Sequence, residues 1–488
     1  MDYTGVVVLC LSFLLLLAIG VPIAFSIGIA GILTMLVSID ALPASTTFAQ
    51  SMARGLDSFP LLAIPFFILA GNIMNRGGIA LRLINLARTL AGSATGGLAF
   101  VNVAANMLFG AISGSAAASA SAIGTIMTPE LKKEGYDPHF SAAINISSAT
   151  TGLSIPPSNV LIVYSLASGG VSITALFLAG YIPGILTGLA IMLVAVSMLL
   201  FKKTGAMAVL RFLAGTTVLA AVLAGCFALF GHTRQSWSQN NHILFWTALA
   251  ALPAAWLIWR SVRFRNRVLE GLRRLLDALP SLLLLVIVIG GIVAGFFTAT
   301  EASAIAVLYT IVLALTYREI GIQDIPGILL HSVKTTAVVM LLVATCMGLS
   351  WILAYESIPQ NVSSALLSVS DNPYVILLII NCILLAVGIF MDMTPAVLIF
   401  TPIFLPIVQT QLGISPVHFG IIMVLNLSIG LCTPPVGSVL FIGCSVAGVK
   451  IDKVIRPLLP IFLAMLLVLL LVTFLPQLAL WLPGILGF

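Results

Sequence analysis

Long apolar stretches alternate with short polar segments along the whole chain of 488 residues. A helix needs about 20 apolar residues to cross the hydrocarbon layer of a bilayer. Stretches of that length recur from one end of the chain to the other. The pattern therefore predicts an all-α polytopic membrane protein.

Two stretches, 96–131 and 374–409, are too long for a single crossing and carry small or polar residues at their centres. At about 1.5 Å per residue, each half would be roughly 25 Å long. We therefore expect each stretch to form a helical hairpin that enters the membrane and returns to the side from which it came.

An internal repeat relates residues 94–171 to residues 372–449. Gly388 lies 278 positions after Gly110, and Pro434 lies 278 positions after Pro156. Glycine and proline set the shape of the backbone rather than its hydrophobicity, so their coincidence indicates a structural repeat. The other matched pairs are Gly135 with Gly413, Pro138 with Pro416, Gly152 with Gly430, Pro157 with Pro435 and Gly170 with Gly448.

Composition excludes a soluble protein, because only 7% of the residues are charged and soluble domains carry about 25%. The net charge of +6 does not indicate nucleic-acid binding, since lysine and arginine lie in short patches between apolar stretches. Such patches orient a membrane protein. The six cysteines lack disulfide or metal-type spacing and are interpreted as small hydrophobic residues.

Basic residues predict the orientation of the loops, because lysine and arginine concentrate on the cytoplasmic side. The segment Met1–Gly5 and the loops 370–373 and 410–415 are free of both, so we place them in the periplasm. The first hairpin then opens from the cytoplasm and the second from the periplasm. Such inverted repeats are typical of secondary transporters. The loops expected in the cytoplasm contain Lys132–Lys133, Lys202–Lys203, Arg260–Arg274, Arg318, Lys334 and Lys450–Arg456.

Each repeat is interrupted at two polar points. These are 113–115 and 154–159 in the first copy, and 391–395 and 432–437 in the second. A Pro-Pro pair frees backbone carbonyls, which at membrane depth are tolerated only inside protein or beside a wet cavity. Carbonyl and hydroxyl oxygens suit a small cation, and helix N-termini favour an anion. The combination indicates a carboxylate that moves together with sodium.

Two acidic residues lie in apolar surroundings. A carboxylate such as Asp392 costs about 2.5–3.5 kcal/mol at the membrane centre, so we expect it to contact a cation or substrate, to cap the helix that follows, or both. Glu301 has capping-box spacing from Thr298, which favours a cap. His139 and His418 are expected to face water at the membrane surface.

Hydroxyl and amide side chains gather before each Pro-Pro pair. They could line a cavity or form hydrogen bonds between helices, and the sequence favours neither. These residues are Asn145, Ser147, Ser148, Thr150 and Thr151 in the first copy, and Asn426 and Ser428 in the second.

At these motifs the sequence resembles the large membrane subunit (the DctM-type M subunit) of tripartite ATP-independent periplasmic (TRAP) transporters. The resemblance covers nearly all of the chain except about 204–260. The matching stretches are Phe59–Phe67, Ser113–Ser115, Ile155–Ser158, Thr300–Ala302, Asn426–Gly430 and Thr433–Gly437.

The resemblance implies an inverted-repeat, elevator-type transporter, similar to the ion transporter superfamily, with two re-entrant hairpins and two broken helices. A mobile transport domain would slide against a scaffold. Sodium would bind in two sites, and substrate would lie between them near Ser113, Ser158 and Asp392. Carried over by position, one sodium site would involve Ser113, Gly114, Ser115, Ser154 and Pro156, and the other Gly388, Asp392, Cys432, Thr433 and Gly437.

The implied organisation has seven parts. Scaffold helices and the arm helix of each repeat would occupy 1–93 and 261–371, with a further scaffold span at 172–203. The first repeat, 94–171, would hold hairpin 96–131 and broken helix 139–169. The second, 372–449, would hold hairpin 374–409 and broken helix 416–447. An inserted pair of spans would occupy 204–260, and a C-terminal span 450–488.

The family also implies partners and a location. The partners are a small four-span membrane subunit and a periplasmic binding protein that delivers an organic anion, such as a C4-dicarboxylate, sialic acid or another carboxylate. Sodium is the coupling ion, no organic cofactor is expected, and the location is the bacterial inner membrane. The chain departs from the family pattern at Ala299, where proline is frequent, and at Ser119, where an acidic residue is common.

We therefore interpret the chain as a sodium-driven importer and not an enzyme. ATP hydrolysis is not expected because a Walker-type phosphate loop is absent from the sequence. One alternative is a stand-alone sodium/divalent-anion symporter that needs no binding protein. A more remote one is a membrane-embedded enzyme acting on lipid, which would need clustered carboxylates or histidines at depth.

The insertion, with apolar runs at 208–231 and 243–259, gives the first testable hypothesis. Its position suggests that it replaces or repositions contacts with the small membrane subunit. Deletion of 206–259 should then weaken copurification of that subunit. Unchanged assembly of the deleted chain would contradict the hypothesis.

Overall fold

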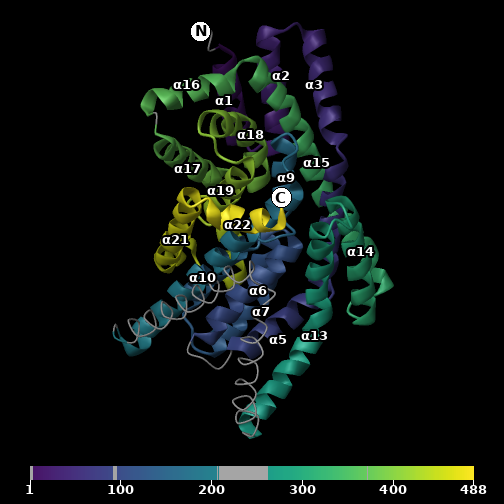
Figure 1. The fold of residues 1–488 in the computed structure, drawn as a ribbon, viewed down its shortest axis with the longest axis vertical. Helices are drawn as coiled ribbons and strands as arrows, with labels where there is room; N and C mark the ends of the chain where they lie inside the picture. The colour runs from purple at the N-terminus through teal and green to yellow at the C-terminus, as the bar shows by residue number, and fades with distance from the viewer. Residues whose placement is uncertain (1–3, 92–95, 206, 208–261, 371) are drawn as a thin grey trace, which may run out of the picture.

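A computed structural model describes residues 4–91, 96–205, 207, 262–370 and 372–488, and all regular structure in these ranges is helical (Figure 1). Within these described ranges, eight helical segments are long and apolar enough to cross a membrane. The prediction of an all-helical polytopic membrane protein is thus confirmed. The inserted runs at 208–231 and 243–259 lie outside the described residues.

One group of helices comes from the segments that precede each repeat, and we call this group the flank. In it, α15 packs against α2, α3 and α4, while α14 packs against α4 and α13. The members are α1 (Thr4–Ala18), α2 (Ile23–Ser38), α3 (Ala41–Leu56), η1 (Phe59–Leu62), α4 (Ala63–Arg76), α5 (Ile79–Ala91), α13 (Val262–Val293), α14 (Ala299–Thr316), η2 (Ile322–Asp324), α15 (Ile325–Tyr355) and α16 (Ile358–Val369).

The remaining helices come from the two repeats and the segments that follow each of them. In Figure 1, α6 and α7 lie in the lower half of the molecule, and α17 and α18 in the upper half. The members are α6 (Gly97–Ser113), α7 (Ala116–Lys133), α8 (Pro138–Thr151), α9 (Asn159–Ala167), α10 (Ile173–Thr204), α17 (Pro373–Phe390), α18 (Met393–Pro406), η3 (Ile407–Gln411), α19 (Pro416–Gly430), α20 (Ser438–Ala447), α21 (Ile451–Phe474) and α22 (Gln477–Leu486).

Local signals set where these helices begin and end. Helix α6 ends because Gly114 adopts a left-handed conformation with φ of 62°, which glycine accepts without steric cost. Helix α7 then begins where the Ser115 hydroxyl accepts a hydrogen bond from the amide of Ala118. Helix α8 begins where Asp137 caps two amides with proline in the next position. The turn between α6 and α7 thus reverses the chain, and the loop between α7 and α8 redirects it.

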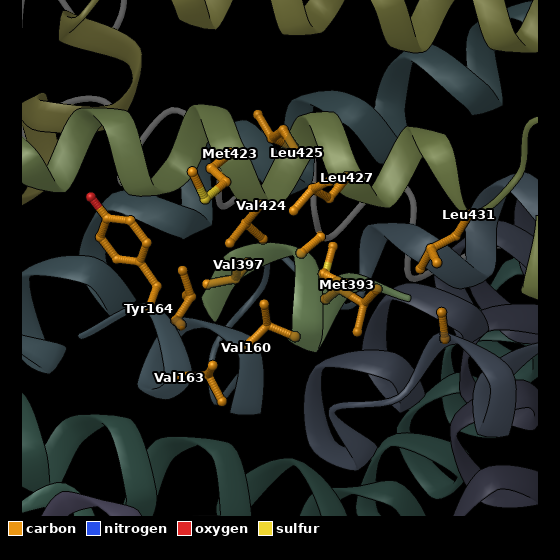
Figure 2. Close-up of a cluster of buried hydrophobic side chains, with 14 of the residues drawn as sticks. Val160, Val163, Tyr164, Met393, Val397, Met423, Val424, Leu425, Leu427 and Leu431 are labelled. Atoms are coloured by element: carbon orange, nitrogen blue, oxygen red, sulfur yellow. The ribbon is translucent and has the colours of Figure 1, made fainter. Parts of the chain in front are cut away.

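The second halves of the broken helices cross over between the repeats. Helix α9 packs against α18 and α19, whereas α20 packs against α7 and α8. Figure 2 shows Val160 and Tyr164 of α9 facing Val397 of α18 and Met423 of α19. The Tyr164 hydroxyl also donates a hydrogen bond of 2.6 Å to the carbonyl of Pro416. The two repeats therefore share one buried core.

Each hairpin is pressed against its broken helix by a pair of glycines. A methyl group on Gly152 would lie 2.4 Å from Cα of Gly110, and one on Gly430 would lie 2.6 Å from Cα of Gly388. Real side chains never approach backbone so closely. Both pairs occupy equivalent positions in the two copies, so the same backbone contact is made twice.

Substitution of Gly152 by alanine tests this contact. The added methyl group meets backbone on the opposing helix, which cannot rotate away, so Gly152→Ala should destabilise the protein by about 1–3 kcal/mol. Thermal unfolding of the purified protein in detergent measures the loss. Gly290→Ala on α13 is the matched control, because nothing lies within 4 Å of the new methyl group. Equal melting temperatures for the two variants would contradict the prediction.

Candidate functional site

A cavity of about 540 Å³ lies where the two hairpin turns meet the two helix breaks. Its wall contains the turn residues Ser113–Ser115 of the first hairpin and Asp392–Thr394 of the second. Residues on both sides of each break complete this wall, among them Leu153, Asn159, Leu431 and Ser438. All four interruptions of the repeats therefore open on one space.

Four helix N-termini face this cavity. The first residues of α7, α9, α18 and α20 all line it. Each N-terminus carries free amides and about half a positive charge, a combination that attracts anions. The cavity lining, drawn from the part of the chain that the structure describes, contains no lysine or arginine. Apart from His331, which also lines the cavity, its attraction for an anion thus comes from the backbone.

Asp392 is the acidic side chain of the cavity lining. One carboxylate oxygen accepts a hydrogen bond of 2.9 Å from the amide of Met393, so the residue caps α18 as expected. The side chain nevertheless remains exposed to the cavity. Within the described ranges no lysine, arginine or histidine forms an ion pair with it. The second oxygen is available to a ligand.

Four of the residues named from the sequence line the cavity: Ser113, Gly114, Ser115 and Asp392. The other predicted site residues are not part of its lining. Ser154 and Ser158 are buried on either side of the first Pro-Pro pair, and their hydroxyl oxygens have no hydrogen-bond partner among the described residues. An unpaired buried hydroxyl is costly unless a ligand satisfies it.

The second break has a comparable arrangement of oxygens. The carbonyls of Leu431 and Thr433 both face Gly437, since a methyl group there would lie 2.5 and 2.9 Å from them. Only glycine allows this approach. The Cys432 thiol is buried and points toward the carbonyl of Ile146 at 3.5 Å. Of the remaining predicted residues, Pro156 is buried and Gly388 packs on Gly430.

The opposite wall of the cavity was not predicted. Its polar residues are Asn72 and Asn75 on α4 and His331 and Thr335 on α15. The spacing of three and four residues places each pair on one helix face. Such polar pairs in otherwise apolar helices are the signal that the sequence offers for this wall, but both helices lie outside the two repeats.

The polar patch before the first break joins helices. The Asn106 amide donates to Asn145 at 3.1 Å and to Ser148 at 2.8 Å, and it accepts from Ser119 at 2.8 Å. In the second copy, the Asn426 amide donates to the side chain of Asn381 at 2.7 Å. Asn145, Ser148 and Asn426 thus form hydrogen bonds between helices. The hydroxyls of the other residues in these two groups donate to carbonyls of their own helices, namely Ser147, Thr150, Thr151 and Ser428.

Two further predictions are resolved by the structure. Glu301 and Thr298 form the expected reciprocal capping box at the start of α14. The expectation for His418 was wrong, because it is 1% exposed and its Nε2 lies 2.8 Å from the carbonyl of Val472. Helix α21 covers this position, and its packing could not be inferred from a histidine that follows a proline at a loop edge.

Comparison with known proteins gives a consistent family. The family model described as the DctM component of the tripartite ATP-independent periplasmic transporter matches residues 10–478. The uncharacterized protein YgiK of Salmonella typhimurium is 52% identical over 478 residues, covering 98% of this chain and 97% of that protein. The C4-dicarboxylate TRAP transporter large permease protein DctM of Pseudomonas aeruginosa is 37% identical, covering 95% of this chain and 94% of that protein.

Two other matches are informative. The isethionate TRAP transporter permease protein DctMQ of Oleidesulfovibrio alaskensis is 37% identical over 97% of this chain, which spans 65% of that protein. The crystal structure of the YdaH transporter of Alcanivorax borkumensis aligns with a TM-score of 0.57 at 14% identity, covering 92% of this chain and 90% of that one. At this identity the structural match shows a shared fold.

The Asn106 network gives a second test of the fold around the cavity. Asn106→Leu removes the amide that donates to the side-chain oxygen of Asn145 and to Ser148, and the oxygen that accepts from Ser119. The Asn145 oxygen then has no donor among the described residues, and Ser119 keeps only its 3.4 Å contact with the Asn106 carbonyl. Each buried polar group left unsatisfied costs about 1–3 kcal/mol, so the melting temperature should fall clearly. Thr125→Val is a suitable control, because its exposed hydroxyl bonds only to its own helix. A fall no larger than that of the control would contradict the importance of the network.

Proposed function

Because this chain belongs to the DctM component family of tripartite ATP-independent periplasmic transporters, we propose that it is the translocating subunit for sodium-coupled uptake of an organic anion. The family consists of transporter permeases and not of enzymes, and the chain is a multi-pass membrane protein. The proposed location is the bacterial inner membrane. Uptake is secondary active transport, with sodium as the coupling ion.

The observation that carries the proposal is the convergence of four helix N-termini on a cavity whose described lining has no lysine or arginine. Such a site favours an anion of modest charge. A carboxylate would lie between the two hairpin turns, in contact with Ser113 and Asp392. Ser158 is buried beside the cavity rather than in its lining, and its hydroxyl would have to turn toward the substrate to contact it. The Ser158 hydroxyl already lacks a partner at the start of α9.

Two sodium ions would lie behind the cavity wall, one at each break. The first site would use Ser113, Gly114, Ser115, Ser154 and Pro156, where the unpaired Ser154 hydroxyl supports it. The second would use Gly388, Asp392, Cys432, Thr433 and Gly437, where two carbonyls converge on Gly437. Hydroxyl, carbonyl and carboxylate oxygens are the ligands that hard cations prefer.

During transport, the two repeats would move together as one body. Because α9 and α20 cross between the repeats, the hairpins and broken helices form one packed body. That body meets the flank at Gly71 of α4, where a methyl group would lie 3.1 Å from Cα of Ser113. We propose that this body is the mobile transport domain of an elevator, and that the flank with α4 and α15 is its scaffold.

The proposed partners follow from the transporter family. A small four-span membrane subunit would bind the scaffold, and a periplasmic binding protein would deliver the substrate. The relative named DctMQ, which extends well beyond the part matched by this chain, supports a permanent association of this kind. The relatives named for C4-dicarboxylate and isethionate support an anionic substrate.

Reconstitution in proteoliposomes tests the function. The chain, its small subunit and its binding protein should together take up a carboxylate from a panel only when a sodium gradient is applied. Asp392→Asn should reduce uptake by about tenfold or more, equivalent to ~1.4 kcal/mol, and raise the sodium concentration needed for half-maximal rate. Asp57→Asn, at the end of α3, is the control.

The outcomes separate the alternatives. Uptake that needs no binding protein would favour the stand-alone symporter. Uptake that is insensitive to sodium, or unchanged in Asp392→Asn at equal melting temperature, would overturn sodium coupling through this cavity.

A further inference from the structure

We propose that an anionic phospholipid binds, through the phosphate of its headgroup, in a second cavity of about 680 Å³ at the end of α10 and the start of α21. This cavity shares no lining residue with the one between the hairpin turns. The inference is independent of the transported substrate and of the coupling ion.

Three cationic side chains from two helices line this cavity. Lys202 lies in the last turn of α10, and Lys453 and Arg456 lie in the first two turns of α21. All three are exposed, and within the described ranges none of them forms an ion pair. Because α10 packs against α21, their charges are held on one side of the cavity.

The other wall is the loop between α7 and α8. Of its two acidic residues that line the cavity, Asp137 is already engaged, because it accepts hydrogen bonds from the amides of His139 and Phe140 at 2.8 and 3.1 Å. Glu134 is exposed beside Lys132 and Lys133. The lining thus holds three cationic side chains and two carboxylates, which leaves an excess of positive charge. The Nδ1 atom of His139 is buried without a described partner and adds a possible donor.

The apolar part of the wall favours a lipid over a free anion. Met198, Leu199, Phe140 and Pro457 contribute it, next to the charged ends of two long apolar helices. A phospholipid has its phosphate at this level of the membrane and its glycerol and acyl chains just below. Basic pockets between helices at the cytoplasmic surface bind phospholipid headgroups in this way.

The cavity lies at the end of the molecule that the basic loops predict to be cytoplasmic. Three basic segments distant in sequence, ending at Lys133, at Lys203 and at Arg456, lie around this one cavity or beside it. The inner leaflet, which contains anionic lipid, is therefore the leaflet next to the site. A bound lipid would link the loop before α8 to the ends of α10 and α21.

Lipid titration of the purified full chain in detergent provides the test. Phosphatidylglycerol should raise the melting temperature and remain bound in native mass spectra, whereas phosphatidylcholine should do neither. Each single substitution, Lys202→Gln, Lys453→Gln or Arg456→Gln, should weaken binding about fivefold, as expected for about 1 kcal/mol per charge. The triple variant should lose the response.

A triple variant with Arg54→Gln, Arg318→Gln and Lys334→Gln is the control, because it removes the same charge outside the lining of this cavity. It should keep the response to phosphatidylglycerol. Equal effects of the two lipids on the unsubstituted chain, or a full response in the first triple variant, would overturn the proposal. Stabilisation of the unsubstituted chain by inorganic phosphate alone, with no preference between lipids, would identify a free-anion site and overturn the assignment to lipid.

Discussion

An interrupted helix inside a membrane exposes backbone donors and acceptors that hydrocarbon cannot satisfy. The part of the chain that the structure describes has two such interruptions between the halves of broken helices, at 152–158 and 431–437, and the structure depends on covering them with protein. The glycine pairs Gly110–Gly152 and Gly388–Gly430 bring hairpin backbone directly onto each break. A side chain at any of these positions would separate the hairpin from the break and expose polar backbone. The close glycine contacts therefore allow the breaks to keep unpaired amides and carbonyls at membrane depth.

Helices α9 and α20 each pack against the other repeat, and this exchange connects the two covered breaks to each other. Each hairpin packs against its own broken helix and also against the second half of the other broken helix. The two breaks are consequently held near one another, and their helix N-termini share a cavity. Separate, uncrossed repeats would produce two distant polar sites instead of one. The symmetry of the sequence thus has a direct consequence for the electrostatics of the cavity.

The repeated glycines and prolines made much of this arrangement predictable. They determine backbone shape, so both breaks could be located from residues such as Gly152 and Pro156. The hairpin turns were indicated by the small and polar residues at the centres of the two long stretches, such as Gly114 and Asp392. Capping of α14 by Glu301 was equally predictable, because a capping box is a local pattern. The wall formed by Asn72 and His331 was not, since it depends on how α4 and α15 dock against the repeats. Burial of His418 depends in the same way on the packing of α21.

The charge balance of the cavity suggests why a cation and an anion would travel together under the proposed function. Four N-termini contribute about half a positive charge each, an effect confined to the first turn of each helix. Asp392 sets a full negative charge among them and opposes an incoming carboxylate. Sodium bound beside Asp392 would neutralise that charge and restore the attraction. By reciprocity, bound substrate must then strengthen sodium binding by the same factor, so a single carboxylate on a hairpin turn is sufficient to link the two ligands.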